Sequence, residues 1–175
     1  MSMSNALIHK NVVLSVSKEK HAIPPPAFWI PSDVAEIGWY YWDGSFFPDE
    51  ASAVNAAALD VYEKVKSYRD AVLQAGYANN GKLYHADARS QAMITAVVSG
   101  IGLNIITQDI KWRAVDNTDT IFSTLEFPLF AAGMFAFVDA QYKTCFKLQD
   151  VLLSYSKIDD VLSFDIQEEW QKAAV

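Results

Sequence analysis

His85 and Asp87 are the residues of this chain whose types and spacing come closest to a catalytic pair. A carboxylate beside a histidine can orient the imidazole as a general base, which would suit hydrolysis. The simpler interpretation is that Asp87 is the N-cap of a following helix, because aspartate is favoured there, and that His85 is solvated. Neither Ser90 nor Ser99 occurs in a strand-turn-helix nucleophile motif. We therefore expect no catalytic residues, and a hydrolase that uses this pair is kept as an alternative.

The remaining candidates for metal or cofactor chemistry do not reach a recognised spacing. His9 and His21 are far from His85 and from each other, whereas metal-binding histidines usually occur at short, fixed spacings. The segment Asp116-Asn117-Thr118-Asp119 resembles part of a calcium loop, but the glycine and the terminal glutamate of that loop are missing. Cys145 is the single cysteine, which excludes an internal disulfide and a multi-cysteine metal site. We expect neither a metal nor a cofactor.

Length and charge restrict the class of protein. The chain has 175 residues with 21 acidic and 14 basic side chains, which gives a net charge of −7. This length suits one ordinary domain or a small module joined to a larger domain. An acidic chain lacks the basic face that supplies most of the affinity for nucleic acid. No segment reaches the roughly 20 apolar residues that span a bilayer, so we expect neither nucleic acid nor a membrane as a partner.

The most distinctive segment is residues 37–47, in which six of eleven residues are aromatic. At its centre, Asp43-Gly44 is a two-residue hairpin signal, because such turns require positive φ angles that glycine accepts easily. Aromatic residues are frequent in strands, and Pro48 should end the second strand. The segment therefore predicts a short aromatic β-hairpin. A lone hairpin is too small to be stable, so it must pack on something or bind something.

Alternate residues of this hairpin should face opposite sides. Trp39 and Tyr41 would then face one side, and Tyr40 and Trp42 the other. One set can pack inward while the other stays accessible, and accessible aromatic residues often anchor protein–protein interfaces. We therefore expect a partner-binding surface formed by Trp39, Tyr40, Trp42 and Phe46. The alternative is that both faces of the hairpin are plain hydrophobic core.

The residues before the aromatic hairpin favour a small β module. Residues 6–16 contain two β-rich runs on either side of Lys10-Asn11, which predicts another hairpin. Pro24-Pro25-Pro26 favours an extended segment, which we interpret as a stiff linker. The first predicted domain is therefore a β module with a Pro-rich linker at residues 1–48, and the second, at residues 49–175, is helical.

The second domain should contain three main helices and an inserted β-hairpin. Residues 49–75 have neither glycine nor proline, and their apolar residues recur about every 3.5 positions, as in coiled coils. A second helix is predicted over residues 88–101 and a hairpin over 110–122. Ser123 and Glu126 form a capping box that opens a very long helix to about residue 155, before a short helix and tail. The fold class is thus α+β, and the narrow helical seams suit an antiparallel helix pair, dimers or trimers.

Residues 82–170 resemble an uncharacterised helical domain that recurs in tail and tail-fibre proteins of tailed bacteriophages. The resemblance rests on several short motifs in a fixed order. These are Tyr84-His85-Ala86-Asp87 at a helix start, Ile110-Lys111-Trp112 in a hairpin, Ser123-Thr124-Leu125-Glu126 opening a long helix, Phe146 with Leu148, and residues 158–166.

The N-terminal part resembles the opening module of phage tail-fibre and fibre-assembly proteins. In that module a short β segment precedes a hairpin of the type Ile-Gly-Trp-x-Tyr-x-Gly-x-Phe. Here Ile37-Gly38-Trp39 begins the hairpin and Phe46 ends it, with one additional residue between Trp39 and Gly44.

The resemblance implies a non-enzymatic structural component of a phage tail, associated with the fibre or the baseplate and acting through protein–protein contacts. Its partners would be other tail proteins and copies of itself. It would be made in the host cytoplasm and located in the virion tail. The alternative within the same resemblance is a tail-fibre assembly chaperone, which binds the fibre transiently and then leaves.

Overall fold

The computed structural model describes residues 4–20, 22–23 and 25–174. Contacts divide the chain into two compact units, which are described separately below. Unit 1 comprises residues 1–63 and 150–165, and unit 2 comprises residues 64–149 and 166–175. The predicted linker begins at Pro24, which lies outside the described residues. The division into two domains at residues 1–48 and 49–175 stays a prediction.

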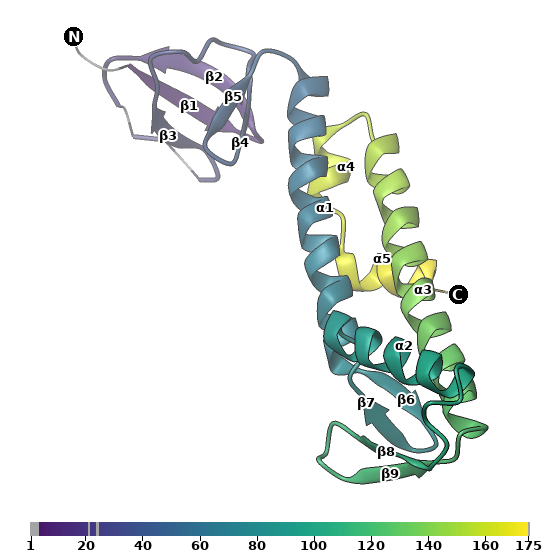
Figure 1. Cartoon of the computed structure of the whole chain (residues 1–175). Helices are drawn as coiled ribbons and strands as arrows, with labels where there is room; N and C mark the ends of the chain where they lie inside the picture. Colours follow the sequence, from purple (N-terminus) through teal and green to yellow (C-terminus); the bar gives the residue numbers. More distant parts are fainter. Residues whose placement is uncertain (1–3, 21, 24, 175) are drawn as a thin grey trace. The chain divides into compact units, whose positions relative to one another are not determined.

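Unit 1 begins with a five-stranded antiparallel sheet in the order β3-β1-β2-β4-β5 (Figure 1). Both predicted tight turns are present. Lys10 and Asn11 have φ angles of 46° and 60°, and Asp43 and Gly44 have 41° and 83°, which is the pattern of hairpin turns with two positive φ angles. The strands are β1 (Asn5–His9), β2 (Val12–Ser17), β3 (Phe28–Pro31), β4 (Tyr40–Trp42) and β5 (Ser45–Phe47).

The core of this sheet is small. Among the described residues, its buried members are Ala6, Ile8, Val13 and Ala35. Cross-strand pairs extend the same face, because Ile8 lies opposite Phe28 across β1 and β3 and paired residues share a face. Two alanines contribute little apolar area, so aromatic side chains must supply much of the packing.

Helix α1 (Glu50–Ala75) belongs to both units, because the division of the chain falls after its residue 63. Asp49 precedes it, and its carboxylate accepts a hydrogen bond of 2.8 Å from the Ser52 backbone N–H, as an N-cap does. The buried residues of α1 include Val54, Ala58 and Val65, which lie on the predicted apolar seam. The short helix α4 (Ile158–Leu162) follows later in the chain. The helix predicted over residues 49–75 is therefore confirmed to within one residue.

Unit 2 contains two antiparallel hairpins, one on each side of helix α2 in the sequence. Residue 115 joins them, because its backbone N–H donates to the carbonyl of Leu83 at 2.8 Å. The capping box that opens α3 is also formed: the Ser123 N–H donates to the Glu126 carboxylate at 2.9 Å and the Glu126 N–H donates to Ser123 Oγ at 3.2 Å. The elements are β6 (Tyr77–Asn79), β7 (Lys82–Tyr84), α2 (Ala88–Gly102), β8 (Ile110–Arg113), β9 (Asp119–Phe122), α3 (Glu126–Ser154) and α5 (Ile166–Ala173). The last residues of α3, from residue 150 on, belong to unit 1.

An aromatic cluster forms the core of unit 2. Phe130 on α3 lies at its centre, with ring centroids 4.7 Å from Phe122 and 4.9 Å from Tyr84. Trp112 on β8 joins the cluster through Phe127, with centroids 5.3 Å apart. The hairpins and α3 are thus held together by one continuous set of packed rings.

Two strands differ from what the sequence indicated. Residues 28–31, for which no strand was predicted, form β3 at the edge of the sheet, where Pro31 needs no N–H donor. Residues 77–79, for which no strand was predicted, form β6, which pairs with β7. Gly76, with a φ of 110°, ends the helix, and its backbone leaves no space for a Cβ beside the Tyr84 carbonyl.

The structure also bears on membranes. Among the described residues, no helix combines the length and the apolar character that crossing a bilayer requires.

Candidate functional site

The inner face of the aromatic hairpin completes the small core of the sheet. Trp39, Tyr41 and Phe46 all pack against its buried residues. Tyr41 lies between two rings, with centroids 5.1 Å from Phe46 and 6.2 Å from Phe28. Two of the four predicted partner-binding residues, Trp39 and Phe46, therefore stabilise the module itself.

The outer face carries a second set of aromatic residues. Tyr40 lies opposite Phe47 on β5 and opposite Val12 on β2, so these three side chains share a face. Trp42, two residues along β4, faces the same side. All of them are partly accessible rather than buried. Trp39 and Tyr41 pack with the core, as the predicted alternation requires. The sheet therefore has aromatic residues on both faces.

The indole nitrogen of Trp42 is unusual on this outer face. It is buried and has no hydrogen-bond partner in the structure of the described residues. An unpaired buried donor costs about 1–3 kcal/mol relative to a satisfied one.

Tyr40 connects the outer face to the helices of unit 1. Its hydroxyl donates to Glu50 Oε2 at 3.4 Å, and the backbone N–H of Ile158 donates to Glu50 Oε1 at 3.3 Å. Desolvation, together with the negative charge of Glu50 and this hydrogen bond, raises the pKa of Tyr40 above its ordinary value. Glu50 therefore holds β4, the start of α1 and the start of α4 at one point.

His85 and Asp87, the pair kept as an alternative catalytic site, lie at the start of α2. The Asp87 carboxylate accepts a hydrogen bond of 2.8 Å from the Ser90 backbone N–H, as the N-cap of α2. This hydrogen bond is the main reason that the pKa of Asp87 lies below its usual value. His85 is exposed, and it lines an open pocket with Ser90, Met93 and three residues of β8.

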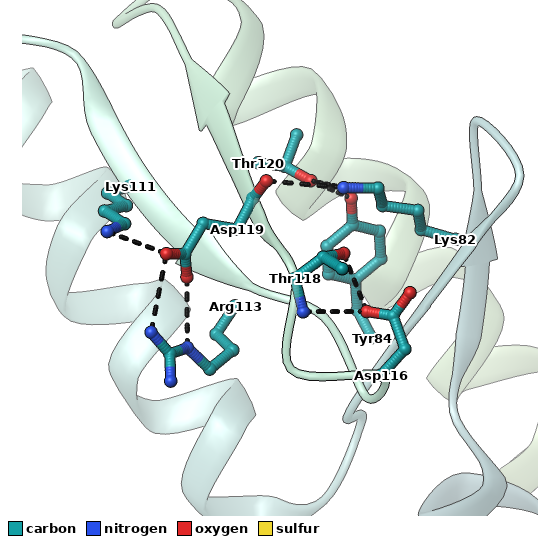
Figure 2. Close-up of polar contacts among 8 residues, drawn as sticks. All are labelled: Lys82, Tyr84, Lys111, Arg113, Asp116, Thr118, Asp119 and Thr120. Atoms are coloured by element: carbon teal, nitrogen blue, oxygen red, sulfur yellow. Dashed lines mark hydrogen bonds and ion pairs between the residues drawn. The ribbon is translucent and has the colours of Figure 1, made fainter.

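Unit 2 also contains a polar cluster that the sequence did not indicate. Asp119 on β9 accepts from two basic side chains of β8: Lys111 Nζ lies 2.7 Å from Oδ2, and Arg113 Nε lies 3.0 Å from Oδ1. Figure 2 shows both cations converging on the one carboxylate. The two hydrogen-bonded cations, Lys111 first, lower the pKa of Asp119. Because Lys111 and Arg113 stand two residues apart on one strand, they share the outer face of this hairpin.

Hydroxyl groups make further contacts on the same hairpin and in its turn. The Thr120 hydroxyl lies 2.8 Å from the Tyr84 hydroxyl and accepts from Lys82 Nζ at 3.2 Å (Figure 2). In the turn, Asp116 accepts from the Thr118 N–H at 2.9 Å and from its hydroxyl at 2.7 Å, and these bonds lower the pKa of Asp116. The calcium-like sequence of this segment is therefore explained as turn chemistry.

These arrangements differ in what they can do. The aromatic outer face offers partly accessible apolar area, which suits contact with a protein. The polar cluster on the outer face of the β8–β9 hairpin keeps a net positive charge, because two cations share one carboxylate. Within residues 4–20, 22–23 and 25–174, no group of three or more histidine, cysteine, aspartate or glutamate side chains is arranged to hold a metal ion. The pairing of Asp119 with β8 could have been anticipated only from the strand register.

Comparison with known proteins gives one match. The family model described as a domain of unknown function, DUF4376, matches residues 56–167. No curated protein and no solved structure matches the chain.

Proposed function

The chain belongs to the DUF4376 family, a domain of unknown function, and we propose that it is a non-enzymatic structural component of a tailed-bacteriophage tail. It would be associated with the fibre or the baseplate and would act through protein–protein contacts. The assignment to a tail rests on the resemblance of residues 82–170 and of the N-terminal module to tail and tail-fibre proteins. The assignment to protein contacts rests on the aromatic sheet of unit 1.

The single observation that carries the proposal is the outer face of that sheet. Tyr40, Trp42 and Phe47 stand on the side opposite the small buried core and stay partly accessible. Aromatic side chains that combine apolar area with a polar tip are frequent anchors of protein interfaces.

Purified phage particles provide the test of this proposal. Mass spectrometry should detect the chain in particles purified by density gradient, at a constant ratio to known tail proteins. Its absence from particles that are otherwise complete, together with its presence in the infected lysate, would contradict a structural role. That second result is the one expected of a tail-fibre assembly chaperone.

A double variant distinguishes a role in partner binding from a role in folding. Replacing Tyr40 and Trp42 together by serine should abolish association with the tail partner while the helical circular dichroism stays nearly intact. Loss of the helical signal would mean that these aromatic residues are core. Trp39→Ser is the matched control, because that side chain packs against the buried residues of the sheet and its loss should unfold the module.

A further inference from the structure

We infer that unit 2 binds a second copy of this chain along the open edge of β9, so that Ile121 of each copy pairs with Ile121 of the other across a two-fold axis. This contact joins two copies of the β8–β9 hairpin into one sheet in the order β8-β9-β9-β8. It stands apart from the proposed function, because it uses neither the aromatic face of unit 1 nor another tail protein.

The hydrogen-bond pattern of the hairpin places the backbone groups of Ile121 on this open edge. The Ala114 N–H donates to the carbonyl of Thr118, the residue opposite it, at 2.8 Å. Opposite pairs of an antiparallel ladder alternate between bonded and non-bonded. Counted along the register from that pair, Asp119 and Ile121 belong to non-bonded pairs, so their N–H and C=O groups point away from β8. Within the part of the chain that the structure describes, the Ile121 N–H and carbonyl have no hydrogen-bond partner.

The edge beside Ile121 is accessible. A cavity of about 320 Å³ lies next to the strand, and its lining includes Thr120, Ile121 and Phe122 of β9 and Leu129 of α3. The side chains of Ile121 and Leu129 are 68% and 74% exposed. Natural proteins usually protect an edge strand with charges, proline or a covering element, and an apolar edge without such protection is a template for pairing with another strand.

The neighbouring positions of the edge are already occupied, and this selects a second copy as the partner. The Asp119 carbonyl accepts from Lys82 Nζ at 3.3 Å (Figure 2), and the Ser123 N–H donates to the Glu126 carboxylate at 2.9 Å. The open edge is therefore one residue long, with one donor and one acceptor. An ordinary peptide strand would find both flanking positions taken, whereas a second Ile121 across a two-fold axis supplies the matching acceptor and donor.

Charge complementarity supports the same register. In an antiparallel pair centred on Ile121, residue 119 of one copy lies opposite residue 123 of the other. The Lys82 ammonium, held at position 119, therefore lies beside the Glu126 carboxylate of the other copy, held at position 123. The two-fold axis repeats this contact, so it forms twice in each dimer. Complementary charges of this kind fix the register of association.

The direct test is sedimentation equilibrium of the full chain at micromolar to millimolar concentration. We expect a reversible and weak monomer–dimer equilibrium, because small interfaces form transient complexes. Ile121→Lys brings two ammonium groups together at the axis and should abolish the dimer. Ile105→Lys is the matched control, because Ile105 is 75% exposed after the end of α2 and the change in charge is the same. It should leave the dissociation constant unchanged, and circular dichroism checks that both variants fold.

Ile121→Pro tests the backbone contact itself. It removes the open N–H, and proline is tolerated on an edge strand where the N–H faces away from the sheet. The dimer loses two backbone hydrogen bonds, so the dissociation constant should rise about five- to 150-fold. Ile121→Lys decides the same question if the proline variant fails to fold.

Two further variants test the register. Lys82→Gln removes both ion pairs of the dimer and should raise the dissociation constant about two- to thirty-fold. Lys143→Gln is its control, because it removes the same charge from a lysine that contacts Asp139 at 2.7 Å on α3, and it should have no effect. Ile121→Cys should form a disulfide-linked dimer under mild oxidation faster than Ile105→Cys, because bonded antiparallel pairs have Cα atoms about 5.5 Å apart, which a disulfide can span. The native Cys145 is buried.

The contradicting results are equally specific. A chain that stays monomeric at millimolar concentration, with Ile121→Cys cross-linking no faster than Ile105→Cys, would overturn the inference. A dimer that the folded Ile121→Lys variant retains, or that Ile105→Lys abolishes equally, would place the contact elsewhere on the chain and overturn it as well. Equal dissociation constants for Lys82→Gln and Lys143→Gln would contradict the register.

Discussion

The five-stranded sheet of unit 1 and the β8–β9 hairpin of unit 2 use aromatic residues in opposite ways. In unit 1 aromatic side chains lie on both faces of the sheet, around a core of small and medium residues. In unit 2 the inner face of the hairpin joins a cluster of buried rings, including Tyr84, Phe122 and Phe130, and the outer face carries Lys111, Arg113 and Asp119. The segment richest in aromatic residues is therefore not the one with the larger core.

This difference shows what aromatic density means in this chain. Buried rings such as Phe130, 3% exposed, stabilise the unit in which they lie. The half-accessible rings of Tyr40 and Trp42 leave apolar area that a partner can cover. If the proposed function holds, stability and recognition belong to different regions, and substitutions in each region should have different readouts.

The largest effect should come from Phe130→Ala. The ring contacts four other aromatic rings of unit 2 at centroid distances of 4.7 to 5.9 Å, and truncating a buried phenylalanine costs about 3–5 kcal/mol. Urea denaturation followed by circular dichroism measures the free energy of unfolding. Phe146→Ala is the control on the same helix, because Phe146 is 52% exposed and its loss should cost less than about 1 kcal/mol. Similar losses for both variants would remove the contrast between buried and accessible rings.

A second prediction concerns Gly133, which lies on α3 under the ring of Tyr77. A Cβ there would meet the Tyr77 hydroxyl, and overpacking of this kind costs about 1–3 kcal/mol. Gly133→Ala should therefore lower the thermal midpoint, and Tyr77→Phe in the same chain should recover part of the loss. Gly102→Ala, where nothing lies within 4 Å of the new Cβ, should be neutral or stabilising, since alanine is the better helix former.

The third prediction tests the structural explanation of Asp87. Asp87→Ala should cost about 1 kcal/mol at neutral pH, because the N-cap of α2 is lost, and Asp87→Asn should keep most of the stability. The folded pKa of Asp87 is lowered, so its stabilisation is present above the unfolded value of about 3.9 and is lost as pH falls through the folded value. Acid titrations of stability should therefore converge for wild type and Asp87→Ala at low pH. Stability curves that stay parallel down to low pH would contradict the N-cap role of Asp87. Separately, loss of an enzymatic activity in a folded His85→Ala variant would support the hydrolase alternative.

The smallest effect is expected for Tyr40→Phe. This change removes the hydrogen bond to Glu50 and keeps the ring, so it should cost about 0.5–1.5 kcal/mol at neutral pH. The folded pKa of Tyr40 is raised, so the contribution is complete below the unfolded value of about 10 and is lost as pH rises through the folded value. Unfolding of wild type and variant at pH 7 and above pH 10 measures this difference. A stability difference that stays constant across this pH range would contradict the interaction between Tyr40 and Glu50.

Local signals in the sequence were sufficient for much of the fold. Lys10-Asn11 and Asp43-Gly44 predicted their turns because few residues accept positive φ, and Ser123 with Glu126 predicted the start of α3 because a capping box satisfies specific backbone groups. These features depend on neighbouring residues only. The strands β3 and β6 were missed because each is short and is stabilised by a partner strand rather than by its own composition.

The candidate sites were less accessible to prediction for the same reason. The alternation of Trp39 and Tyr40 follows from strand geometry, but the contact of Tyr40 with Glu50 depends on how α1 leaves the sheet. The pocket beside Trp112 requires His85 and Met93 to meet β8, and no spacing along the chain encodes that meeting. These sites depend on contacts between separate elements of the fold, so the sequence alone did not predict them.

The most direct test of the central claim is quantitative mass spectrometry of phage particles assembled with wild-type chain or with the Tyr40→Ser and Trp42→Ser double variant. Leu14→Ser, at a 52% exposed position of the same sheet, is the control. The proposal predicts that wild type and the control are incorporated at the same ratio to other tail proteins, and that the folded double variant is lost from the particles. Equal incorporation of the double variant, or absence of the wild-type chain from complete particles, would contradict it.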